Sequence, residues 1–467
     1  MAHGGSDLDR SLSALRTRHR GELIGPEDEG YDDVRAVWNG MIDRRPAVIV
    51  RPTGTADVVA AVEFARESDL EIAVHGGGHN VAGLSTVDGG VVIDLSEMNG
   101  VVVDPSARRV RVQGGATLGD VDHETQLHGL ATALGAVSET GVAGLTLNGG
   151  YGHLSREFGL AADNLRSVEV VTADGRVRTA SENEHEDLFW AIRGGGGNFG
   201  IVTTFEFALH EVGPEVSALF VWFPGDDSVT VLERFREWGE SAPRTAGVLP
   251  FLGHVPELEG FPEEHWGEPT IACLGSFRGD PAESEAVFAP LVEGATPIAD
   301  FSGRMRFETL QSMLDEDYPD GLRYYWKSIF LDDITDEVIE IACRYNEDAP
   351  SSLSTIDIWL LGGAVADVPR EATAFWHREK PYMINFEANW EDLADDDENV
   401  AWVREGFAEV EALSVASGRY GNFPGFANDP ARLLFGENYD RLVEVKTRYD
   451  PENRFRLNQN VPPNADA

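Results

Sequence analysis

Three glycine-dense segments, all in the first half of the chain, constrain its fold more than any other feature. They are residues 74–80 (VHGGGHN), 148–152 (NGGYG) and 193–200 (RGGGGNFG). Because glycine has no Cβ, consecutive backbone N–H groups can converge on an anion at close range. One such segment could be an ordinary turn. Three of them predict a long, multiply charged ligand that is held at several points, such as a dinucleotide.

The third segment contains a G-x-G-x-x-G pattern at Gly195, Gly197 and Gly200. In a nicotinamide-binding Rossmann unit this pattern follows a strand and opens a helix. Here the preceding residues 186–192 are predicted to form a helix, and residues 201–209, rich in β-branched and aromatic side chains, are predicted to form a strand. The order is reversed, which argues against a Rossmann unit.

Taken together and in this order, the motifs resemble the FAD-linked oxidases with a vanillyl-alcohol-oxidase (PCMH-type) flavin domain, in the berberine-bridge-enzyme-like branch. The resemblance implies FAD as the cofactor and an α+β fold of two domains. These are a PCMH-type FAD-binding fold and a substrate domain with an antiparallel sheet backed by helices. The motifs that carry the resemblance are residues 51–58, 75–85, 135–164, 170–175, 188–203, 420–423 and 449–460.

The pattern of elements agrees with this division. Short helices and strands alternate irregularly up to about residue 212, whereas longer candidates follow, including strands at 216–223, 270–277 and 382–390. We therefore expect an N-terminal FAD-binding part (1–212), a substrate domain (213–414) and a C-terminal berberine-bridge-type segment (415–467) that returns to the FAD-binding part.

The resemblance also implies individual roles around the cofactor. His79 is expected to bond covalently to the 8α carbon of the flavin, which requires a neutral imidazole. Val137 occupies the place of the cysteine that forms a second bond in bicovalent members, so a single covalent link is expected. His75 stands where the family more often has arginine, and the small side chain of Thr140, at the position controlling oxygen access, favours an oxidase.

The full set of expected cofactor-binding residues is Gly76, Gly77, Gly78, His79, Asn80, Thr140, Gly141, Gly144, Asn148, Gly149, Gly150, Gly152, Gly197, Gly200, Ile201, Val202, Asn458 and Asn460.

Three residues are candidates for the chemistry on the substrate. Tyr420, in the Tyr-x-Asn match with Asn422, is the first choice for the base, with Lys327 as a neighbour that could stabilise its phenolate. Glu387 is the second choice. It shares one face of the predicted strand 382–390 with Asn385 and Asn389, and that face looks either at the flavin or at solvent.

The expected activity is that of a FAD-dependent oxidoreductase. It would move hydride from a C–OH group of a sugar or alcohol, or from a C–N group, to flavin N5 and then to O2. The alternatives are a dehydrogenase with another acceptor and a flavin-binding protein without turnover. Aromatic residues that suit sugar rings and aromatic alcohols equally are Trp326, Trp359, Trp390 and Tyr382.

Composition excludes other functions. The chain has 37 Lys+Arg against 81 Asp+Glu, with a formal net charge of −44, whereas nucleic-acid binding needs a basic face. We interpret the acidity as that of a salt-accumulating halophile. Cys273 and Cys343 show no metal-type spacing and are expected to be buried thiols, although a disulfide stays possible. No apolar run could span a membrane and no signal-peptide core is present, so a cytoplasmic location is expected.

The acidity predicts that salt stabilises the fold. At molar salt the Debye length falls to about 3 Å, so crowded carboxylates no longer repel each other. The melting temperature should therefore rise as potassium chloride is raised from about 0.1 M to molar concentration. The same series near pH 4.5, the isoelectric point, is the control and should show a much smaller gain. A melting temperature that is independent of salt at neutral pH would contradict the halophilic interpretation.

Overall fold

The computed structural model describes residues 4–425 and 431–464. Its N-terminal half contains two sheets, and the first is four-stranded in the order β1-β2-β4-β3, with β2, β4 and β3 parallel. These strands are β1 (Glu22–Ile24), β2 (Val48–Arg51), β3 (Ile72–His75) and β4 (Val91–Asp94). Helix α3 (Thr55–Glu67) packs its apolar side on this sheet, and α1 (Gly4–Arg18) packs on α3.

The second sheet is antiparallel, in the order β5-β6-β10-β8-β9. Its strands are β5 (Val101–Asp104), β6 (Arg109–Gln113), β8 (Leu165–Val171), β9 (Val177–Ser181) and β10 (Ile201–Ala208). Side chains alternate along β6, where Val110 and Val112 are buried and Arg109 and Arg111 are exposed, as a half-buried strand requires. Helix α7 (Glu186–Ile192) precedes β10, so the predicted helix-before-strand order around the third glycine segment is confirmed.

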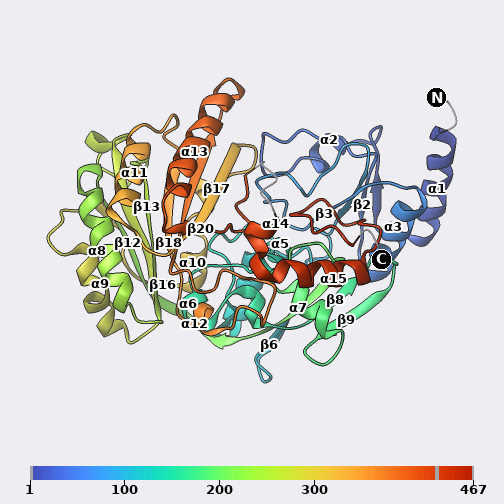
Figure 1. The fold of residues 1–467 in the computed structure, drawn as a ribbon, viewed down its shortest axis with the longest axis horizontal. Helices are drawn as coiled ribbons and strands as arrows, with labels where there is room; N and C mark the ends of the chain where they lie inside the picture. Colours follow the sequence, from blue (N-terminus) through green and yellow to red (C-terminus); the bar gives the residue numbers. More distant parts are fainter. Residues whose placement is uncertain (1–3, 426–430, 465–467) are drawn as a thin grey trace.

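The other end of the molecule is a nine-stranded antiparallel sheet in the order β15-β12-β14-β13-β18-β19-β17-β20, with β16 paired to β12 (Figure 1). The strands are β12 (Glu215–Pro224), β13 (Ala246–His254), β14 (Pro269–Phe277), β15 (Ala299–Asp300), β16 (Gly303–Arg306), β17 (Arg323–Leu331), β18 (Thr355–Leu360), β19 (Tyr382–Trp390) and β20 (Ala416–Ser417). One face of the sheet is covered by α8 (Ser228–Ser241), α9 (Ser284–Val292), α11 (Asp336–Glu347) and α13 (Asp396–Glu411). The predicted sheet backed by helices is therefore confirmed.

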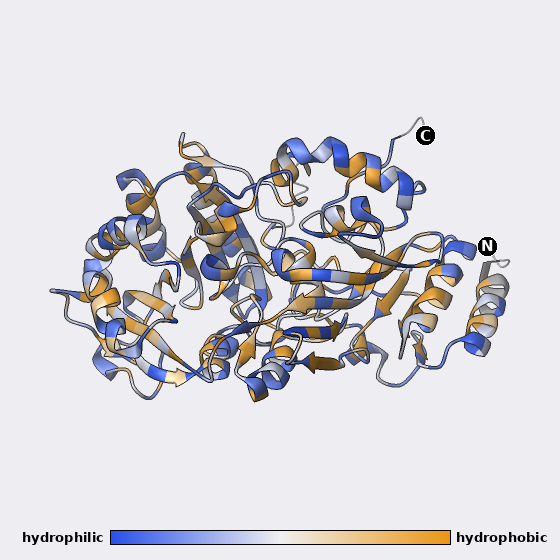
Figure 2. Cartoon of the chain, turned by 90° about the horizontal axis from the view of Figure 1, so that it is seen from below, coloured by the Kyte–Doolittle hydropathy of each residue, from blue (hydrophilic) through white to orange (hydrophobic). Residues whose placement is uncertain are grey.

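Shorter elements complete the chain. They are α2 (Tyr31–Val34), α4 (Leu118–Thr125), β7 (Leu130–Ala131), α5 (Val142–Leu147), α6 (Ser155–Phe158), β11 (His210–Glu211), α10 (Phe307–Gln311), α12 (Ala364–Asp367), α14 (Ala431–Phe435) and α15 (Tyr439–Tyr449). Figure 2 shows hydrophobic residues concentrated in the strands inside the molecule, with mixed hydropathy in the surface helices.

Strand β13 and helix α11 are among the elements that were not expected from the sequence. Strand β13 has Pro250 at its centre, and proline normally argues against a central strand because it has no N–H to donate. Helix α11, by contrast, has a clear apolar stripe that includes Val338, Ile341 and Ala342, so the 3.6-residue period could have revealed it. Cys273 lies on β14 and Cys343 on α11, and both thiols are free.

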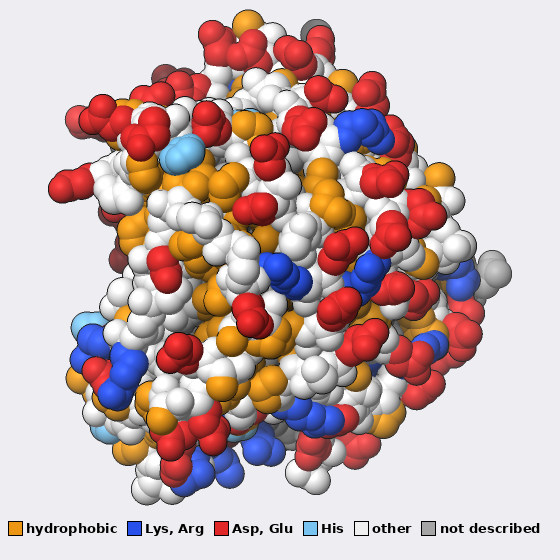
Figure 3. All heavy atoms as spheres, turned by 90° about the vertical axis from the view of Figure 1, so that its left-hand side faces the viewer, with side chains coloured by type: hydrophobic (Ala, Val, Ile, Leu, Met, Phe, Trp, Pro, Cys, Tyr) orange, Lys and Arg blue, Asp and Glu red, His pale blue; other side chains and the backbone are white. Residues whose placement is uncertain are grey.

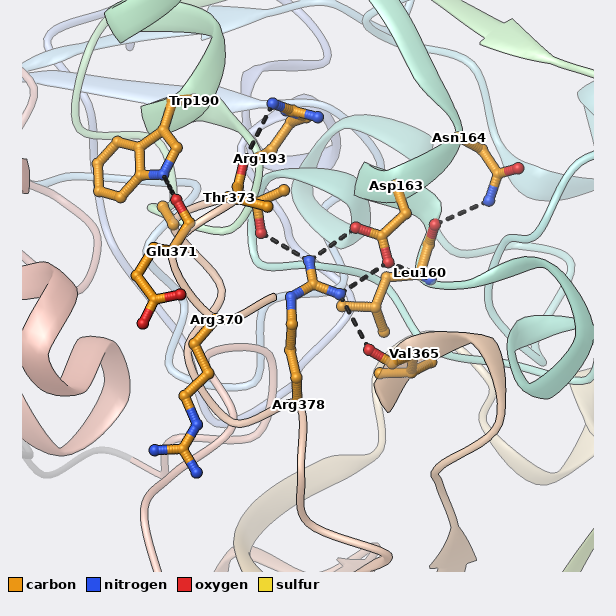
Figure 4. A network of polar contacts seen from close by, with 12 residues as sticks. Leu160, Asp163, Asn164, Trp190, Arg193, Val365, Arg370, Glu371, Thr373 and Arg378 are labelled. Atoms are coloured by element: carbon orange, nitrogen blue, oxygen red, sulfur yellow. Dashed lines mark hydrogen bonds and ion pairs between the residues drawn. The ribbon is translucent and has the colours of Figure 1, made fainter. Parts of the chain in front are cut away.

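A buried ion pair joins the two ends of the molecule (Figure 4). Arg378, in the connection between β18 and β19, donates to both carboxylate oxygens of Asp163 at 2.7 and 3.0 Å and to the hydroxyl of Thr373 at 2.6 Å. Nearby, the indole of Trp190 donates to the carbonyl oxygen of Glu371 at 2.8 Å. These contacts hold the long β18–β19 connection against the N-terminal half.

The last part of the chain also packs on the N-terminal half. Helix α15 lies on α7, and the ammonium of Lys446 donates to the carbonyl oxygens of Asn198 and Phe455, both at 2.8 Å, and to Asp450 at 2.6 Å. The side chains of Lys446 and Asp450 are fully buried. This node ties the C-terminal segment to the third glycine segment.

The surface is strongly acidic, and Figure 3 shows carboxylates far outnumbering basic side chains on the end formed by the nine-stranded sheet and its helices. In the part of the chain that the structure describes, none of the helices is both long enough and apolar enough to cross a bilayer.

Lys446→Met should destabilise the protein by about 3–5 kcal/mol, because it leaves the buried carboxylate of Asp450 without its cation. Urea or thermal unfolding measures the loss. The matched control is Lys380→Met, since Lys380 pairs with the exposed carboxylate of Asp332 and should cost less than about 1 kcal/mol. Equal losses in the two variants would contradict the importance of the buried node.

Candidate cofactor and substrate site

A large cavity lies where the glycine segments meet the nine-stranded sheet. Fourteen of the expected cofactor residues line it: Gly76, Gly77, Gly78, His79, Asn80, Thr140, Gly141, Gly144, Asn148, Gly197, Gly200, Ile201, Val202 and Asn458. Two of the three candidate catalytic residues, Tyr420 and Glu387, line it as well. Segments separated by more than 300 residues are therefore brought to one site.

The first glycine segment offers an unused row of donors. The backbone N–H groups of Gly77, Gly78, His79 and Asn80 donate to no other group in the described part of the chain. A Cβ on Gly77 would lie 2.5 Å from the backbone nitrogen of Gly141, so only glycine allows these two loops to touch. Consecutive free N–H groups of this kind form an anion-binding cradle.

The residues present fit FAD. Among the described residues that line the cavity there is no lysine or arginine, so a pyrophosphate would be met by backbone dipoles rather than by side-chain cations. The buried side-chain oxygens of Asn148 and Asn458 lack a hydrogen-bond partner within the protein, and both residues line the cavity. Unpaired buried polar atoms are rare, and a hydroxylated, nitrogen-rich cofactor would satisfy them.

His79 is held in an aromatic stack. Its ring lies parallel to that of Trp38 with centroids 5.0 Å apart, and Trp38 stacks in turn on Tyr324 at 3.7 Å. The indole of Trp38 donates to the carbonyl oxygen of Tyr318 at 2.8 Å, which fixes the stack to the segment that precedes β17. Burial lowers the pKa of His79 to about 4, so the imidazole is neutral at physiological pH. A neutral ring nitrogen is what a covalent bond to a flavin requires.

Of the other three positions discussed for the cofactor side, two line the cavity and one does not. Val137 lines the cavity together with Thr140, whereas His75, at the end of β3, is not part of the cavity wall. Burial lowers the pKa of His75, and the neighbouring Asp94 opposes that shift only in part. His75 therefore supplies no fixed positive charge to the site.

Gly149, Gly150 and Gly152 are not among the residues of the cavity wall, so their expected role in binding the cofactor stays a prediction. A Cβ on Gly149 would meet the ring of Phe375 at 2.7 Å, and one on Gly152 would meet the carbonyl oxygen of Leu134 at 2.2 Å. These glycines allow the turn beneath the site to pack closely against its neighbours. Asn460 also lies outside the cavity wall, although its side-chain oxygen is buried without a partner.

Tyr420 lies at the cavity wall with its hydroxyl surrounded by donors. Asn422 donates to the phenolic oxygen at 2.9 Å, and the backbone N–H groups of Gly150 and Tyr151 also favour the phenolate. Burial outweighs these contacts and raises the pKa of Tyr420 to about 12. Forming the phenolate at pH 7 would therefore cost about 7 kcal/mol.

Lys327 is not beside Tyr420, which corrects the expectation that it would stabilise the phenolate. On β17 it shares a face with Tyr325 and Ile329, which belong to the core under the helices. Its ammonium lies 4.3 Å from the ring centroid of Phe407 on α13. The side chains of the adjacent residues Trp326 and Ser328 point to the opposite face, and Trp326 lines the cavity.

Glu387 lies on the cavity face of β19, which excludes the solvent-exposed alternative. Its neighbours on the strand, Phe386 and Ala388, point into the core under the helices, and Glu387 is only 2% exposed. Tyr318 donates its hydroxyl proton to one carboxylate oxygen at 2.9 Å, and the amide of Asn385 donates to the other. Burial and a neighbouring carboxyl, that of Asp357, raise the pKa of Glu387 well above its usual range.

The four aromatic residues proposed to contact the substrate lie on opposite faces of the nine-stranded sheet. Trp326 and Trp359 line the cavity, whereas Trp390 and Tyr382 belong to the core on the helix side of the sheet, so the expectation that all four suit a substrate is wrong for these two. Wall residues that the sequence interpretation did not select include Trp38, Ser85, Tyr151, Asp357, Tyr318, Phe423, Leu457 and Gln459. Asp357 shares one face of the predicted strand 354–362 with Trp359, which was selected, but alternation alone does not show which face meets the cavity.

Comparisons with known proteins agree with this geometry. Residues 46–181 match the FAD-binding domain family, and residues 420–462 match the family described as berberine and berberine-like. A FAD-linked oxidoreductase from Dictyostelium discoideum is 32% identical over 447 residues, which are 93% of each protein. This chain belongs to the berberine-bridge-enzyme-like FAD-linked oxidoreductases.

Two further relatives show the range of the family. The glucooligosaccharide oxidase of Sarocladium strictum is 28% identical over 95% of this chain and 93% of its own length. The crystal structure of 6-hydroxy-D-nicotine oxidase from Arthrobacter nicotinovorans superposes with a TM-score of 0.85 at 28% identity, covering 96% of this chain and 98% of the oxidase. The chain is thus a FAD-linked oxidoreductase, and the expected enzyme class and PCMH-type fold are confirmed.

Proposed function

We propose that this FAD-linked oxidoreductase is an oxidase that acts on a C–H bond next to a hydroxyl or amine group. The observation that carries the proposal is the large cavity in which the cofactor loops face a buried carboxyl, Glu387, on the substrate sheet. Bound FAD would supply the hydride acceptor and, with O2 as the final acceptor, hydrogen peroxide would be the second product. The chain's own residues hold the substrate and take its proton.

The cavity wall suits a small ring-containing substrate. Trp326, Trp359 and Phe423 offer flat apolar faces, on which sugar rings and aromatic rings both stack. The two named relatives act on an oligosaccharide and on a hydroxylated nicotine, so both classes belong in a substrate panel. Glu387 is favoured over Tyr420 as the base, because the phenolate of Tyr420 is costly and Lys327 points to the helix-covered face of the sheet.

The cofactor link is proposed to be a single covalent bond through His79. The neutral imidazole, its fixed stacking on Trp38 and the presence of valine at position 137 support this proposal. Valine cannot form a thioether, so the second link of bicovalent relatives has no counterpart here. The small Thr140 at the cavity wall supports O2 as the electron acceptor.

The proposed activity is tested by mixing the yellow enzyme without oxygen with a panel of sugars, aromatic alcohols and cyclic amines. A substrate should bleach the flavin, and admitting air should restore the colour with release of hydrogen peroxide. Bleaching that air reverses only slowly, but that an artificial dye reverses at once, would indicate a dehydrogenase. A flavin that no compound in the panel bleaches would contradict the proposal.

His79→Ala should abolish covalent attachment while leaving the fold intact. Denatured wild-type protein should keep its yellow fluorescence on a gel, and the variant should release all of its flavin on acid precipitation. His75→Ala is the matched control, since His75 lies outside the cavity wall and its loss should leave the covalent link in place. Complete release of flavin from the acid-precipitated wild type would overturn the assignment.

A further inference from the structure

Two carboxyl groups lie side by side on the cavity face of the nine-stranded sheet. Asp357 is on β18 and Glu387 is on the adjacent antiparallel strand β19, in a register that pairs Asp357 with Asn385 and Thr355 with Glu387. The two acids are therefore diagonal neighbours on one face. Both line the cavity, and they are only 4% and 2% exposed.

The hydrogen bonds around the pair leave room for a proton between the two carboxyls. Glu387 already accepts from Tyr318 and Asn385, and the carboxyl of Asp357 on the neighbouring strand is close enough to raise the pKa of Glu387. A hydrogen bond between the two carboxyls requires that one of them carries a proton. The second oxygen of Asp357, Oδ1, is buried and accepts no hydrogen bond from the protein.

The other charged and titratable groups facing the pair do not neutralise it. Burial raises the pKa values of Tyr318 and Tyr324, and nearby carboxylates that include Glu387 raise both further, so they stay neutral phenols. Asp317, on the segment before Tyr318, acts on Asp357 only through its negative charge. No lysine or arginine is among the described residues of the cavity wall.

We propose that Asp357 and Glu387 share one proton and act together as the base of the oxidation. Two like charges this close cannot both ionise in a buried site, so the pair keeps a single negative charge near neutral pH. Burial and the mutual repulsion raise the pKa values of both carboxyls. The inference rests on the proposed oxidase function, but the sharing of the proton can be tested without turnover.

The reaction step balances as follows. The O–H or N–H bond of the substrate breaks and its proton moves to the singly charged pair. Bound FAD would supply the acceptor for the hydride of the neighbouring C–H bond. The substrate leaves as the carbonyl compound or imine. The pair then holds two protons and must release one to water before the next turnover. Asp357 is thus placed to share the charge that Glu387 would otherwise carry alone.

The first test is the pH dependence of thermal unfolding in wild type, Asp357→Asn, Glu387→Gln and the double variant. A buried carboxyl with a raised pKa keeps its proton in the folded state, so its contribution to stability falls as pH rises above the pKa of the unfolded chain. Wild type should therefore lose more of its melting temperature between about pH 5 and pH 9 than either single variant does.

The interaction itself is read from the double variant. If the two carboxyls share a proton, each single variant already removes their repulsion. At high pH the increases in melting temperature of the two single variants, relative to wild type, should therefore add up to more than the increase in the double variant. Gains that simply add, or a change in melting temperature that is the same at every pH, would overturn the shared proton.

The second test is anaerobic flavin reduction by the best substrate of the panel. Each single variant should slow reduction by about 100-fold or more, and the double variant should be little slower than the slower single variant, because the residues act as a unit. Asp317→Asn is the control and should change the rate only slightly, since it removes a charge but not the hydrogen-bonded pair.

Three results would count against the pair as the base. Near-wild-type flavin reduction in Asp357→Asn would mean that Glu387 acts alone. A double variant slowed by the product of the two single effects would mean that the two groups act independently. Slow reduction in Tyr420→Phe together with fast reduction in the carboxyl variants would assign the base to Tyr420. If wild type is reduced by no compound, the proposed function fails, while the unfolding experiment still decides whether the proton is shared.

Discussion

The buried ion pair between Arg378 and Asp163 is the contact on which the geometry of the site depends. Removing a guanidinium and a carboxylate from water is costly unless their hydrogen bonds are satisfied. Here both oxygens of Asp163 accept from Arg378, and one also accepts the backbone N–H of Leu160. The arginine is completely buried, so the pair is shielded from salt as well as from water. It fixes the β18–β19 connection on the glycine-rich half of the molecule.

That fixed connection sets the distance across the cavity. On one side of it lie β18 and β19, which carry Asp357 and Glu387, and on the other lie the turns beneath the cofactor loops. The same connection also packs on the glycine-rich half through apolar atoms, where the ring of Phe375 lies close to Gly149. The carboxyls and the imidazole of His79 are therefore held by a rigid frame, which is what a hydride transfer over a short distance requires.

Much of the fold could be predicted from local patterns in the sequence. Helix α7 and strand β19 were expected with the bounds that the structure shows, because the spacing of their apolar residues is regular. Strand β13 could not be expected, since Pro250 is tolerated there by pairing that no local pattern reveals. The division of the chain at residues 212 and 414 stays a prediction.

The sequence predicted the cofactor side of the site better than the side formed by the nine-stranded sheet. The cofactor loops are local in sequence, so most of their residues were found directly. Lys327 was misplaced because alternation along β17 tells which residues share a face but not which face meets the cavity, and only the pairing of β17 with β19 decides that. Asp357 was missed for the same reason: its importance comes from a neighbour on another strand.

The cavity wall has a further consequence for a protein so rich in carboxylates. Lysine or arginine side chains that held the cofactor would compete with dissolved cations for its phosphates, and binding would weaken as the salt concentration rises. Backbone N–H groups carry no mobile counterion, and the described wall offers the phosphates no other donor of positive charge. Binding of the phosphates is in this way independent of the salt around the surface, because it depends on backbone N–H groups at glycine positions rather than on charged side chains.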